Sequence, residues 1–523
     1  MKESTPTYVV TQDTRSLFQR VSYNGELSQD FLTTIDTYFT TIQQCISDGI
    51  PDVKVVGFYE ADINMQLAQS VRGELNTNPD SCCIILDRYL LPDVEKEFPE
   101  RFFRFSITRT IDGKKTPRPG DLSFAEQIQN MVQKTPDLEQ KPIIMVDDGI
   151  FSGGTIKDTV GIFDTYGIKL RVQSVIGFVG QKRNTVSSDD IRPVILQPIK
   201  TLYDWVDIRD FGPLGGKIFK TSKNNRVATT IPYLYPWSYG EDASLNTTPD
   251  LFSISSNLII GLRKVITEFE QQSNQTLRFR DLVNRGFALP VTGDTRAIPI
   301  SINDRVIDYL DRCVKLIKFE QQRKVFVFDM DGTLYQLDGE DNGYKSSCLE
   351  STVKKNAIYF IMKRENCTSI QAEDIYTSGI SDPIGLSKFL GQRYSISREE
   401  YFDNVWNIDP QEIIQIYSTP ITVIKRIAKT DAKLILLTSA PKIWARKVLV
   451  YLGVADCFEI VFTGEQFKTK EDIFQLLASW YQPTNICSIG DQEGTDIIPA
   501  RKNGLNTLVI RSEGDFEELS VNI

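Results

Sequence analysis

The sequence of 523 residues contains no histidine. This absence excludes Ser-His-Asp triads, zinc sites built on histidine and imidazole proton shuttles, so carboxylates, lysine, tyrosine, thiols or a bound metal must carry any acid-base chemistry. The eight cysteines form no CxxC pair and no spacing typical of zinc sites. We therefore expect reduced and mostly buried thiols, as in proteins of a reducing compartment.

Long apolar runs are also absent. None approaches the roughly 20 residues that a membrane span requires, and the opening stretch MKESTPTYVV lacks the basic and then apolar layout of a signal peptide. The formal net charge of −10 argues against broad contact with nucleic acid or anionic membranes. These features predict a cytoplasmic protein that acts on small-molecule substrates, and they leave its oligomeric state open.

The chain is too long for one ordinary hydrophobic core. From about residue 50 to 200, short β-branched runs at 53–59, 82–86, 142–146 and 172–179 alternate with helix-like stretches, which predicts one parallel sheet in a domain of residues 1–215. Five further runs, at 325–328, 434–438, 458–463, 485–490 and 506–510, predict a second parallel sheet in a domain of residues 321–523. Residues 216–320 have mixed character and no recognisable function. We predict two Rossmann-like parallel-sheet domains joined by a connecting region.

The second of these domains carries an insertion of helical character at about residues 340–430. One helix start inside it is marked by Asp409 as the N-cap, Pro410 as the first helical residue and Glu412 at the capping-box position. The insertion therefore predicts a helical cap over the sheet.

Polar residues follow four successive strands of the second domain. In the stretch KVFVFDMDGTLYQLDG, two aspartates come directly after a buried strand. Because ligands of parallel sheets bind at the carboxyl ends of the strands, we expect these residues to meet at one edge. Two carboxylates there repel each other unless a cation lies between them, so Mg²⁺ is the expected cofactor. The residues are Asp329, Asp331, Thr438, Lys468, Asp491 and Asp496.

These motifs together resemble those of the haloacid dehalogenase-type phosphatases, and the insertion is most similar to that of the pyrimidine 5′-nucleotidase-like branch. The resemblance rests on DxDGT from Asp329 to Thr333, the apolar run that ends in Thr438, a following lysine, and GDxxxxD from Gly490 to Asp496. It implies that Asp329 is the nucleophile, that Asp331 is the acid and base, and that Thr438 and the lysine bind the phosphoryl group. It also implies Mg²⁺ ligands at Asp329, at the backbone carbonyl of Asp331, and at Asp491 and Asp496.

Two lysines compete for the role in this motif. The stretch FKTKEDIF offers Lys468 and Lys470, and the spacing to Phe474 that is common in the family favours Lys468. Lys470 stays open as the alternative. A DxDGT alone also occurs as a strand followed by an Asp-Gly turn, so it is the agreement of four motifs in order that favours a catalytic site.

A second constellation, PIIMVDDGIFSGGTI, spans residues 142–156. Backbone amides in a glycine loop at a helix start form an anion pocket, whereas adjacent carboxylates are suited to ribose hydroxyls. The stretch resembles the ribose-phosphate signature of type I phosphoribosyltransferases. The resemblance places the sugar hydroxyls and the 5-phosphate on the residues Asp147, Asp148, Ser152, Gly153, Gly154 and Thr155. The alternative is the nucleotide-binding helix start of another α/β fold.

Flanking segments bear on that resemblance. The loop 108–121 would cover pyrophosphate, and Trp205 is either an aromatic wall for a base or a core tryptophan. The segment EADIN after Tyr59 lacks the small residues of the family's pyrophosphate loop. The candidate pyrophosphate contacts in the loop are Arg109, Lys114, Lys115 and Arg118.

Two sites on one chain predict consecutive reactions in nucleotide metabolism. In this interpretation a phosphoribosyl group is transferred from phosphoribosyl pyrophosphate, and the phosphate of the nucleotide-like product is then hydrolysed with Mg²⁺. Two other interpretations remain open. The first domain could sense a phosphoribosyl ligand and regulate a nucleotide phosphatase, or the chain could deplete or modify nucleotides in a stress or defence system.

Overall fold

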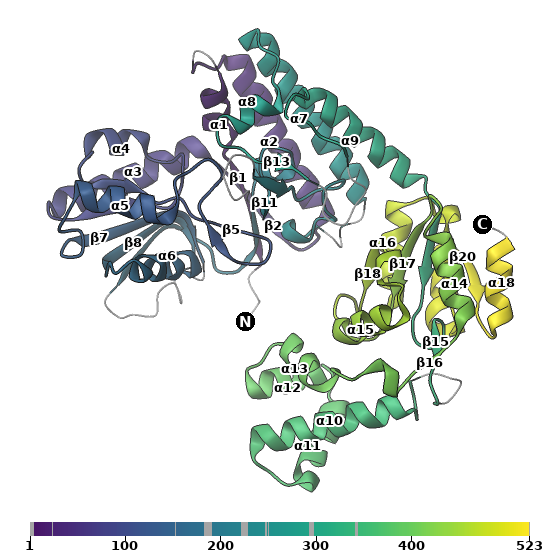
Figure 1. The fold of residues 1–523 in the computed structure, drawn as a ribbon. Helices are drawn as coiled ribbons and strands as arrows, with labels where there is room; N and C mark the ends of the chain where they lie inside the picture. The colour runs from purple at the N-terminus through teal and green to yellow at the C-terminus, as the bar shows by residue number, and fades with distance from the viewer. Residues whose placement is uncertain are drawn as a thin grey trace. The chain divides into compact units, whose positions relative to one another are not determined.

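The computed structural model describes residues 5–22, 25–151, 153–181, 191–220, 228–245, 248, 250–291, 298–339 and 344–521. The chain divides into two compact units, Met1–Ile317 and Lys318–Ile523 (Figure 1). The second unit begins three residues before the boundary drawn from the sequence at 321. Residues 216–317 belong to the same unit as the N-terminal residues, and the two units are described separately.

A five-stranded sheet, parallel throughout, forms one half of the first unit. Its strands follow the order β4 (Phe102–Arg104), β3 (Cys82–Ile85), β7 (Pro142–Ile150), β8 (Arg171–Gly180) and β9 (Arg192–Pro198). Alternate residues face opposite sides, so Cys83 and Ile85 pack on α3 (Glu60–Thr77). Cys82 and Ile84 pack on α5 (Phe124–Lys134) and α6 (Gly154–Thr165). Helices thus cover both faces of the sheet, as its uniformly apolar strands require.

A three-stranded parallel sheet forms the other half, in the order β10 (Leu202–Asp207), β1 (Thr7–Gln12) and β2 (Lys54–Tyr59). The sequence places a strand at β2 correctly, but the expectation that it shares a sheet with β3 and β7 is wrong. The reason is β1, which pairs along its whole length with β2, from Thr7 opposite Lys54 to Gln12 opposite Tyr59.

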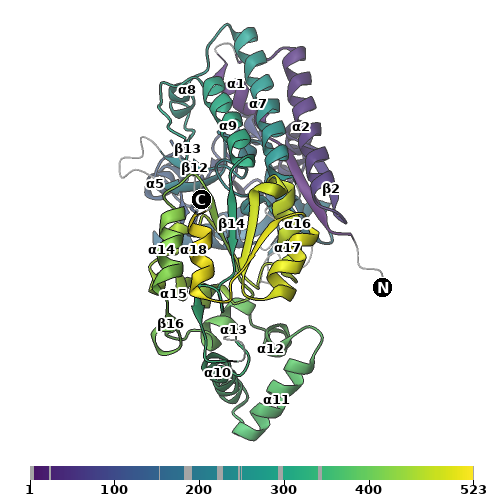
Figure 2. The ribbon, with the colours of Figure 1, turned by 90° about the vertical axis from the view of Figure 1, so that its right-hand side faces the viewer.

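Helices α2 (Gln29–Gly49) and α7 (Leu251–Ser273) lie side by side against this smaller sheet (Figures 1 and 2). A further small sheet joins β11 (Lys217–Lys220), β12 (Thr229–Ile231) and β13 (Leu289–Pro290). The remaining elements of the unit are α1 (Thr14–Val21), α4 (Pro92–Glu97), β5 (Thr108–Arg109), β6 (Lys115–Thr116), α8 (Phe279–Val283) and α9 (Val306–Gln321), the last of which continues into the second unit.

The second unit contains a five-stranded parallel sheet with all five strands that the sequence predicts. Their order is β18 (Ile460–Phe462), β17 (Lys433–Leu437), β14 (Val325–Phe328), β19 (Ile486–Gly490) and β20 (Asn506–Val509). One face packs on α14 (Ser418–Ile427), α15 (Lys442–Leu452) and α18 (Glu513–Val521). Helices α16 (Lys470–Trp480) and α17 (Ile498–Lys502) lie on the opposite side (Figure 2).

Four helices form the cap. They are α10 (Cys348–Glu365), α11 (Ser369–Ser381), α12 (Leu386–Tyr394) and α13 (Arg398–Val405), and they contact one another (Figure 1). The chain enters and leaves the cap through β15 (Tyr335–Gln336) and β16 (Gln415–Ile416), which pair antiparallel. Helix α14, which falls inside the expected range 340–430, packs on α18 of the sheet domain instead.

The prediction of a helix that starts at Asp409 is wrong in its extent. Asp409 accepts a hydrogen bond from the Gln411 backbone as a cap should, but the helix ends after one 3-10 turn, Pro410–Glu412. The reason lies in the next residues, because Gln415 and Ile416 pair with β15 and adopt extended backbone. Tertiary pairing has here overridden a local helix signal.

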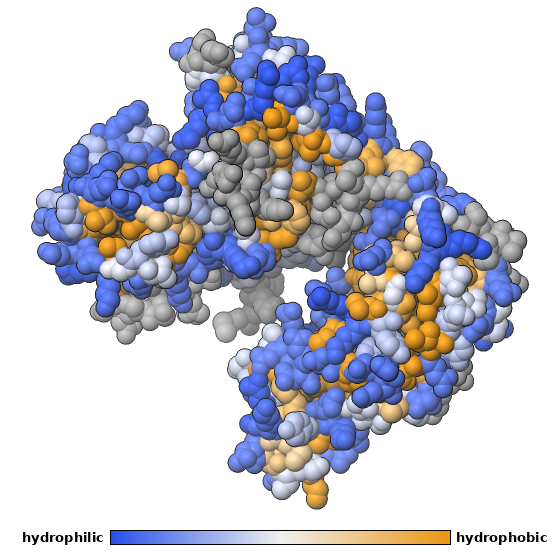
Figure 3. Space-filling view, viewed as in Figure 1, coloured by the Kyte–Doolittle hydropathy of each residue, from blue (hydrophilic) through white to orange (hydrophobic). Residues whose placement is uncertain are grey.

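Among the described residues, no helix combines the length and the apolar character that crossing a bilayer needs. Figure 3 shows one face of the molecule, on which hydrophilic side chains predominate and hydrophobic ones gather in smaller areas between them.

Candidate functional site

Two adjacent strands of the second unit deliver three acidic side chains to one point. Asp329 follows β14, Asp491 follows β19, and Asp496 lies in the π-helical turn Glu493–Ile497 that comes next. Carboxylate oxygens of the three lie within 4.8 Å of one another. Asp329 and Asp496 are buried, with 7% and 1% of their surface exposed, and Asp491 is half-buried. The prediction that these three residues meet is confirmed.

Two glycines make room for this convergence. Gly332 has a positive φ of 83°, and a Cβ there would lie 2.4 Å from Oδ2 of Asp491. A Cβ on Gly490 would lie 2.4 Å from Oδ2 of Asp496. Any side chain at either position would therefore displace a carboxylate, which explains the glycines of the two motifs.

The acidic groups perturb one another strongly. Burial together with the charges of Asp329 and Asp496 raises the pKa of Asp491 to about 7. Burial and the charge of Asp329 raise the pKa of Asp496 to about 6, although Lys470 opposes this. Both carboxyls are thus held above their ordinary range because the protein places too little positive charge beside them.

Lys470, and not Lys468, is the lysine that reaches the carboxylates. Its Nζ lies 2.5 Å from Oδ1 of Asp329 and 2.6 Å from Oδ1 of Asp496. Although burial disfavours its charged form, the two carboxylates hold the pKa of the Lys470 ammonium above its ordinary value. The expectation for Lys468 is therefore corrected. Thr469 caps α16 in a capping box with Asp472, which turns the first helical residue, Lys470, inward and leaves the Lys468 side chain exposed.

Asp331 occupies a separate position from the acidic cluster. Its Oδ1 accepts a hydrogen bond from the Tyr335 hydroxyl, and its Oδ2 lies 3.4 Å from Oγ1 of the fully buried Thr438. Burial raises the pKa of the Asp331 carboxyl, while hydrogen bonds from Tyr335 and Trp444 and the charge of Lys470 oppose the shift. The Asp331 side chain therefore lies beside Tyr335 and Thr438, and among the described residues it is not part of the cluster that could hold a metal.

The cluster of Asp329, Asp491 and Asp496 fits a hard divalent cation such as Mg²⁺. All of its donors are oxygens, as that ion prefers. The raised pKa values of Asp491 and Asp496 are those of carboxylates that share a buried space without enough countercharge. A cation bound there would relieve this repulsion.

A cavity of about 830 Å³ opens beside the cluster. Gly332, Thr333 and Asp491 form its inner end. Its other lining residues come from the connections to the cap and from the segment after β20, and they carry aromatic, basic and acidic side chains. They include Tyr344, Lys345, Tyr417, Arg511, Glu513 and Phe516, of which Arg511 pairs with Glu493 at 2.9 Å. Sequence reasoning did not find them, because nothing in their local pattern distinguishes them from ordinary surface residues.

The first unit has its own cavity, of about 470 Å³, at the carboxyl end of β7. Asp147, Asp148 and Thr155 line it, as the sequence predicts. Gly153 precedes α6 with a positive φ of 68°, and Gly154 is the first residue of that helix. Ser152 lies outside the described residues.

Basic residues of the loop 108–121 line the same cavity. Arg109, Lys115 and Arg118 do so, and the first two pair with Asp158 at 3.6 and 2.7 Å. Lys114 does not line it, because its ammonium group pairs with Asp112 and its side chain is 82% exposed. The predicted cationic side of the pocket is therefore formed by three of the four residues.

Trp205 is half-buried at the cavity. It is among the lining residues, and its Nε1 donates to Oγ1 of Thr11 at 2.9 Å. It also packs so closely on β7 that a Cβ on Gly149 would lie 1.3 Å from the ring. The residue is a wall of the pocket held by core contacts.

The two aspartates that line this cavity have raised pKa values as well. Burial, with the nearby charge of Asp87, raises the pKa of Asp147 to about 7 against the opposing charge of Arg118. Burial and the charges of Asp147 and Asp207 hold the pKa of Asp148 well above its ordinary range. The cavity is thus lined by both basic and acidic side chains, and its carboxyl groups favour protons, hydroxyl donors or cations.

Comparisons with known proteins concern the second unit. A family model described as haloacid dehalogenase-like hydrolase matches residues 323–504. A phosphoglycolate phosphatase of Vibrio vulnificus (strain CMCP6) is 26% identical over 199 residues, which are 35% of this chain and 82% of the relative. The solved structure of a HAD phosphatase from Thermococcus onnurineus is 18% identical and covers 38% of this chain and 97% of its own, with a TM-score of 0.29. Residues 323–504 therefore form a haloacid dehalogenase-like hydrolase domain.

Binding of Mg²⁺ to the acidic cluster should stabilise the chain. At a concentration 100 times its dissociation constant, the ion should raise the free energy of unfolding by about 2.7 kcal/mol. Asp491→Asn should remove most of this gain, because it removes both charge and a ligand oxygen. Thermal unfolding with Mg²⁺ and with a chelator measures the effect. Asp456→Asn, at an exposed position, is the matched control. An equal gain in Asp491→Asn and in the control would contradict the assignment.

Asp147 should make the first unit less stable as the pH rises. Its folded pKa of about 7 lies above the ordinary unfolded value of about 3.9, so its contribution is present below pH 4 and is lost between pH 4 and 7. Asp147→Asn keeps the acceptor for the Asp148 backbone. We expect it to equal the wild type at pH 4 and to exceed it by up to about 4 kcal/mol at pH 8.

Urea unfolding at the two pH values measures this difference. Asp93→Asn, whose side chain is 77% exposed, should change neither value. A loss of stability in Asp147→Asn at pH 8 would show that the carboxylate is stabilising, contrary to the prediction.

Proposed function

We propose that the second unit is a Mg²⁺-dependent phosphomonoesterase that forms an aspartyl-phosphate on Asp329. One observation carries the proposal. The carboxylate of Asp329 lies at the end of the central strand with Lys470 on one side and Asp491 on the other. A buried carboxylate between a cation and a further acidic group is suited to approach a phosphoryl group and is poorly explained as a structural ion pair.

The reaction follows from the residues in two steps. An oxygen of Asp329 attacks phosphorus, the bond from phosphorus to the ester oxygen breaks, and that oxygen takes a proton from Asp331. In the second step water gives a proton to Asp331 and attacks phosphorus, which releases phosphate and restores Asp329. Asp331 is suited to this exchange because burial favours its protonated form.

Charge on the transferred group is neutralised by the surrounding side chains. The Lys470 ammonium and the Thr438 hydroxyl are the donors for the phosphoryl oxygens. Asp329, Asp491 and Asp496 would hold Mg²⁺, which when bound lowers the repulsion between phosphoryl oxygens and carboxylates.

A nucleotide-like substrate fits the cavity beside the site. Tyr344, Tyr417 and Phe516 offer aromatic surface to a base. Lys345 and Arg511 offer positive charge to a further anionic group. The relative that is named a phosphoglycolate phosphatase acts, by that name, on a small ester, so the aromatic walls are what favour a larger substrate here.

For the first unit we propose a phosphoribosyl site. The cavity joins the basic side chains of Arg109, Lys115 and Arg118 to the acidic pair of Asp147 and Asp148, an arrangement suited to a phosphorylated sugar. In the favoured reaction a base nitrogen bonds to the anomeric carbon of phosphoribosyl pyrophosphate, and the bond from that carbon to pyrophosphate breaks. The second unit would then remove the 5′-phosphate and make the sequence irreversible.

A second candidate is a module that binds a phosphoribosyl ligand without turnover and regulates the phosphatase. One observation favours it. Helix α3 begins at Glu60, directly after β2 ends at Tyr59, and Glu60 is buried and bonded to Ser16. This connection has no free loop that could hold pyrophosphate.

Lys470→Met should lower kcat/KM for phosphomonoesters by about 10²- to 10³-fold, because it removes a buried donor to the phosphoryl group. Lys468→Met should stay close to the wild type, since its side chain is exposed. Phosphate release by the two purified variants, with circular dichroism to verify folding, measures the difference. The larger loss in Lys468→Met would restore the sequence-based assignment.

Asp329→Asn should abolish phosphate release and leave pyrophosphate release unchanged, because the two reactions use separate units. The chain is incubated with phosphoribosyl pyrophosphate, Mg²⁺ and a metabolite extract, and mass spectrometry identifies the products. Loss of both activities would indicate one composite site. Absence of pyrophosphate release in the wild type would favour the regulatory module.

A further inference from the structure

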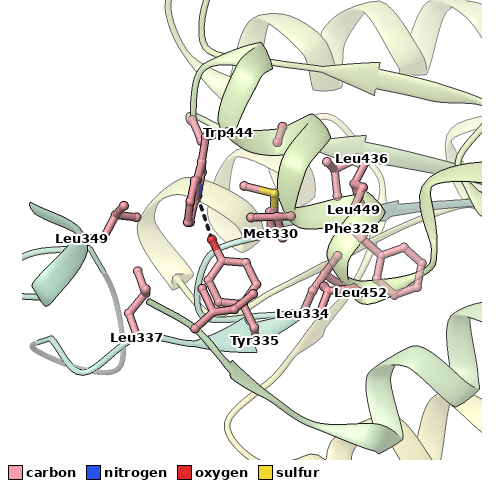
Figure 4. Packing of buried hydrophobic residues seen from close by; sticks show 14 of the residues in the cluster. Phe328, Met330, Leu334, Tyr335, Leu337, Leu349, Leu436, Trp444, Leu449 and Leu452 are labelled. Carbon is pink, nitrogen blue, oxygen red and sulfur yellow. Dashed lines mark hydrogen bonds between the residues drawn. The ribbon is translucent and has the colours of Figure 1, made fainter. Parts of the chain in front are cut away.

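Tyr335 and Trp444 form a buried pair behind the proposed acid and base. Tyr335 is 1% exposed and Trp444 is fully buried. The indole Nε1 of Trp444 lies 3.1 Å from the Tyr335 hydroxyl oxygen, and the two rings point toward each other in the core (Figure 4). The same hydroxyl contacts Oδ1 of Asp331.

The direction of these hydrogen bonds follows from counting hydrogens. An indole N–H only donates, so the Tyr335 oxygen accepts from Trp444, whose N–H also interacts with the Asp331 carboxylate. The single hydrogen of the Tyr335 hydroxyl is then free for one acceptor, and the Asp331 Oδ1 is the acceptor in contact with it. A donor thus occupies one lone pair of Oδ1, which favours Oδ2 as the oxygen that carries the proton given to a substrate.

The other oxygen of Asp331 is held less tightly. Oδ2 lies 3.4 Å from Oγ1 of Thr438, which is longer than an ordinary bond between two oxygens. The Thr438 oxygen in turn accepts from the Ala440 backbone at 3.1 Å. Since Thr438 is a proposed donor to the phosphoryl group, Oδ2 is the oxygen on the substrate side.

The backbone fixes Tyr335 relative to Asp331. The Gly332 amide donates to the Tyr335 carbonyl at 3.0 Å, and the Leu334 amide donates to the Met330 carbonyl at 2.9 Å, so the loop closes on itself. Met330, Leu334 and Leu337 surround the tyrosine ring in the core (Figure 4). A hydroxyl held in this way restricts rotation of the carboxylate that it contacts.

We propose that Tyr335, oriented by Trp444, is a positioning residue that fixes the Asp331 carboxylate so that its Oδ2 gives the proton to the leaving oxygen and takes it from water. The inference rests on the proposed phosphomonoesterase and deepens it. Among the described hydrogen bonds, the Tyr335 hydroxyl contacts the carboxylate of Asp331 and none of the carboxylates of Asp329, Asp491 and Asp496, so Tyr335, which also lines the cavity, acts on the proton transfer through Asp331.

Leaving-group dependence separates positioning from a merely structural role. The leaving oxygen of an alkyl phosphomonoester needs a proton, whereas nitrophenolate departs without one. Tyr335→Phe should therefore lower kcat/KM, which reports formation of the aspartyl-phosphate and not its hydrolysis, about 30-fold for an alkyl phosphate, a part of the 10²- to 10⁴-fold that general acid catalysis supplies. It should lower kcat/KM for p-nitrophenyl phosphate no more than about threefold. Trp444→Phe should also lower kcat/KM more for the alkyl phosphate than for p-nitrophenyl phosphate, but by a smaller factor than Tyr335→Phe.

Two further variants complete the design. Asp331→Asn should show the selective loss in full, and Tyr335→Phe should add nothing to it in the double variant, because both act on one proton transfer. Tyr401→Phe, a buried tyrosine of the cap, is the matched control for loss of a hydroxyl and should leave both rates near the wild type. All rates are measured on the full chain in Mg²⁺.

The outcomes distinguish this inference from the proposed function. Equal losses on both substrates in Tyr335→Phe, or additive losses in the double variant, would overturn the positioning role alone. If Tyr335→Phe does not fold, equal losses in Trp444→Phe would overturn it in the same way. A wild type that releases phosphate from neither ester would overturn the phosphomonoesterase and the inference with it.

Discussion

Repulsion between buried carboxylates is the constraint around which the second unit is arranged. Parallel strands all end at one edge of the sheet, so residues at the ends of neighbouring strands converge. Asp329, Asp491 and Asp496 converge in this way, and besides burial the charge of Asp329 disfavours the charged forms of both Asp491 and Asp496. Positive charge beside these carboxylates offsets their repulsion and stabilises the site. Lys470 supplies one charge from the first turn of α16, and a bound divalent ion would supply the rest.

The first unit also places carboxylates and cations around one cavity. Asp147 and Asp148 also lie at the carboxyl end of a buried central strand, yet the cations in their cavity come from a loop rather than from a helix start. Side chains on a loop are held by fewer contacts than those on a helix. In a chain without histidine, both units thus contain aspartates whose pKa burial raises toward neutral pH, a shift that is frequent among acid-base groups.

The sequence predicted those parts that depend on local pattern. Apolar runs followed by polar residues located every strand of the second sheet, and with them the three clustered aspartates, because strand ends fix side-chain positions. It was wrong for Lys470, whose orientation follows from a local capping box that the sequence analysis did not identify. It was also wrong where residues distant in the sequence pair, because β1 takes β2 out of the larger sheet and β15 ends the helix predicted at Asp409. The sequence likewise did not show that Trp444, 109 residues away, donates to the Tyr335 hydroxyl.

The ribbon of β15 and β16 has a mechanical consequence. It is the covalent route between the sheet domain and the cap, so any swing of the cap is transmitted through these four residues. Tyr335 is one of them, and its hydroxyl contacts the carboxylate of Asp331. A displacement of the cap that moved β15 would therefore also move the hydroxyl that holds this carboxylate.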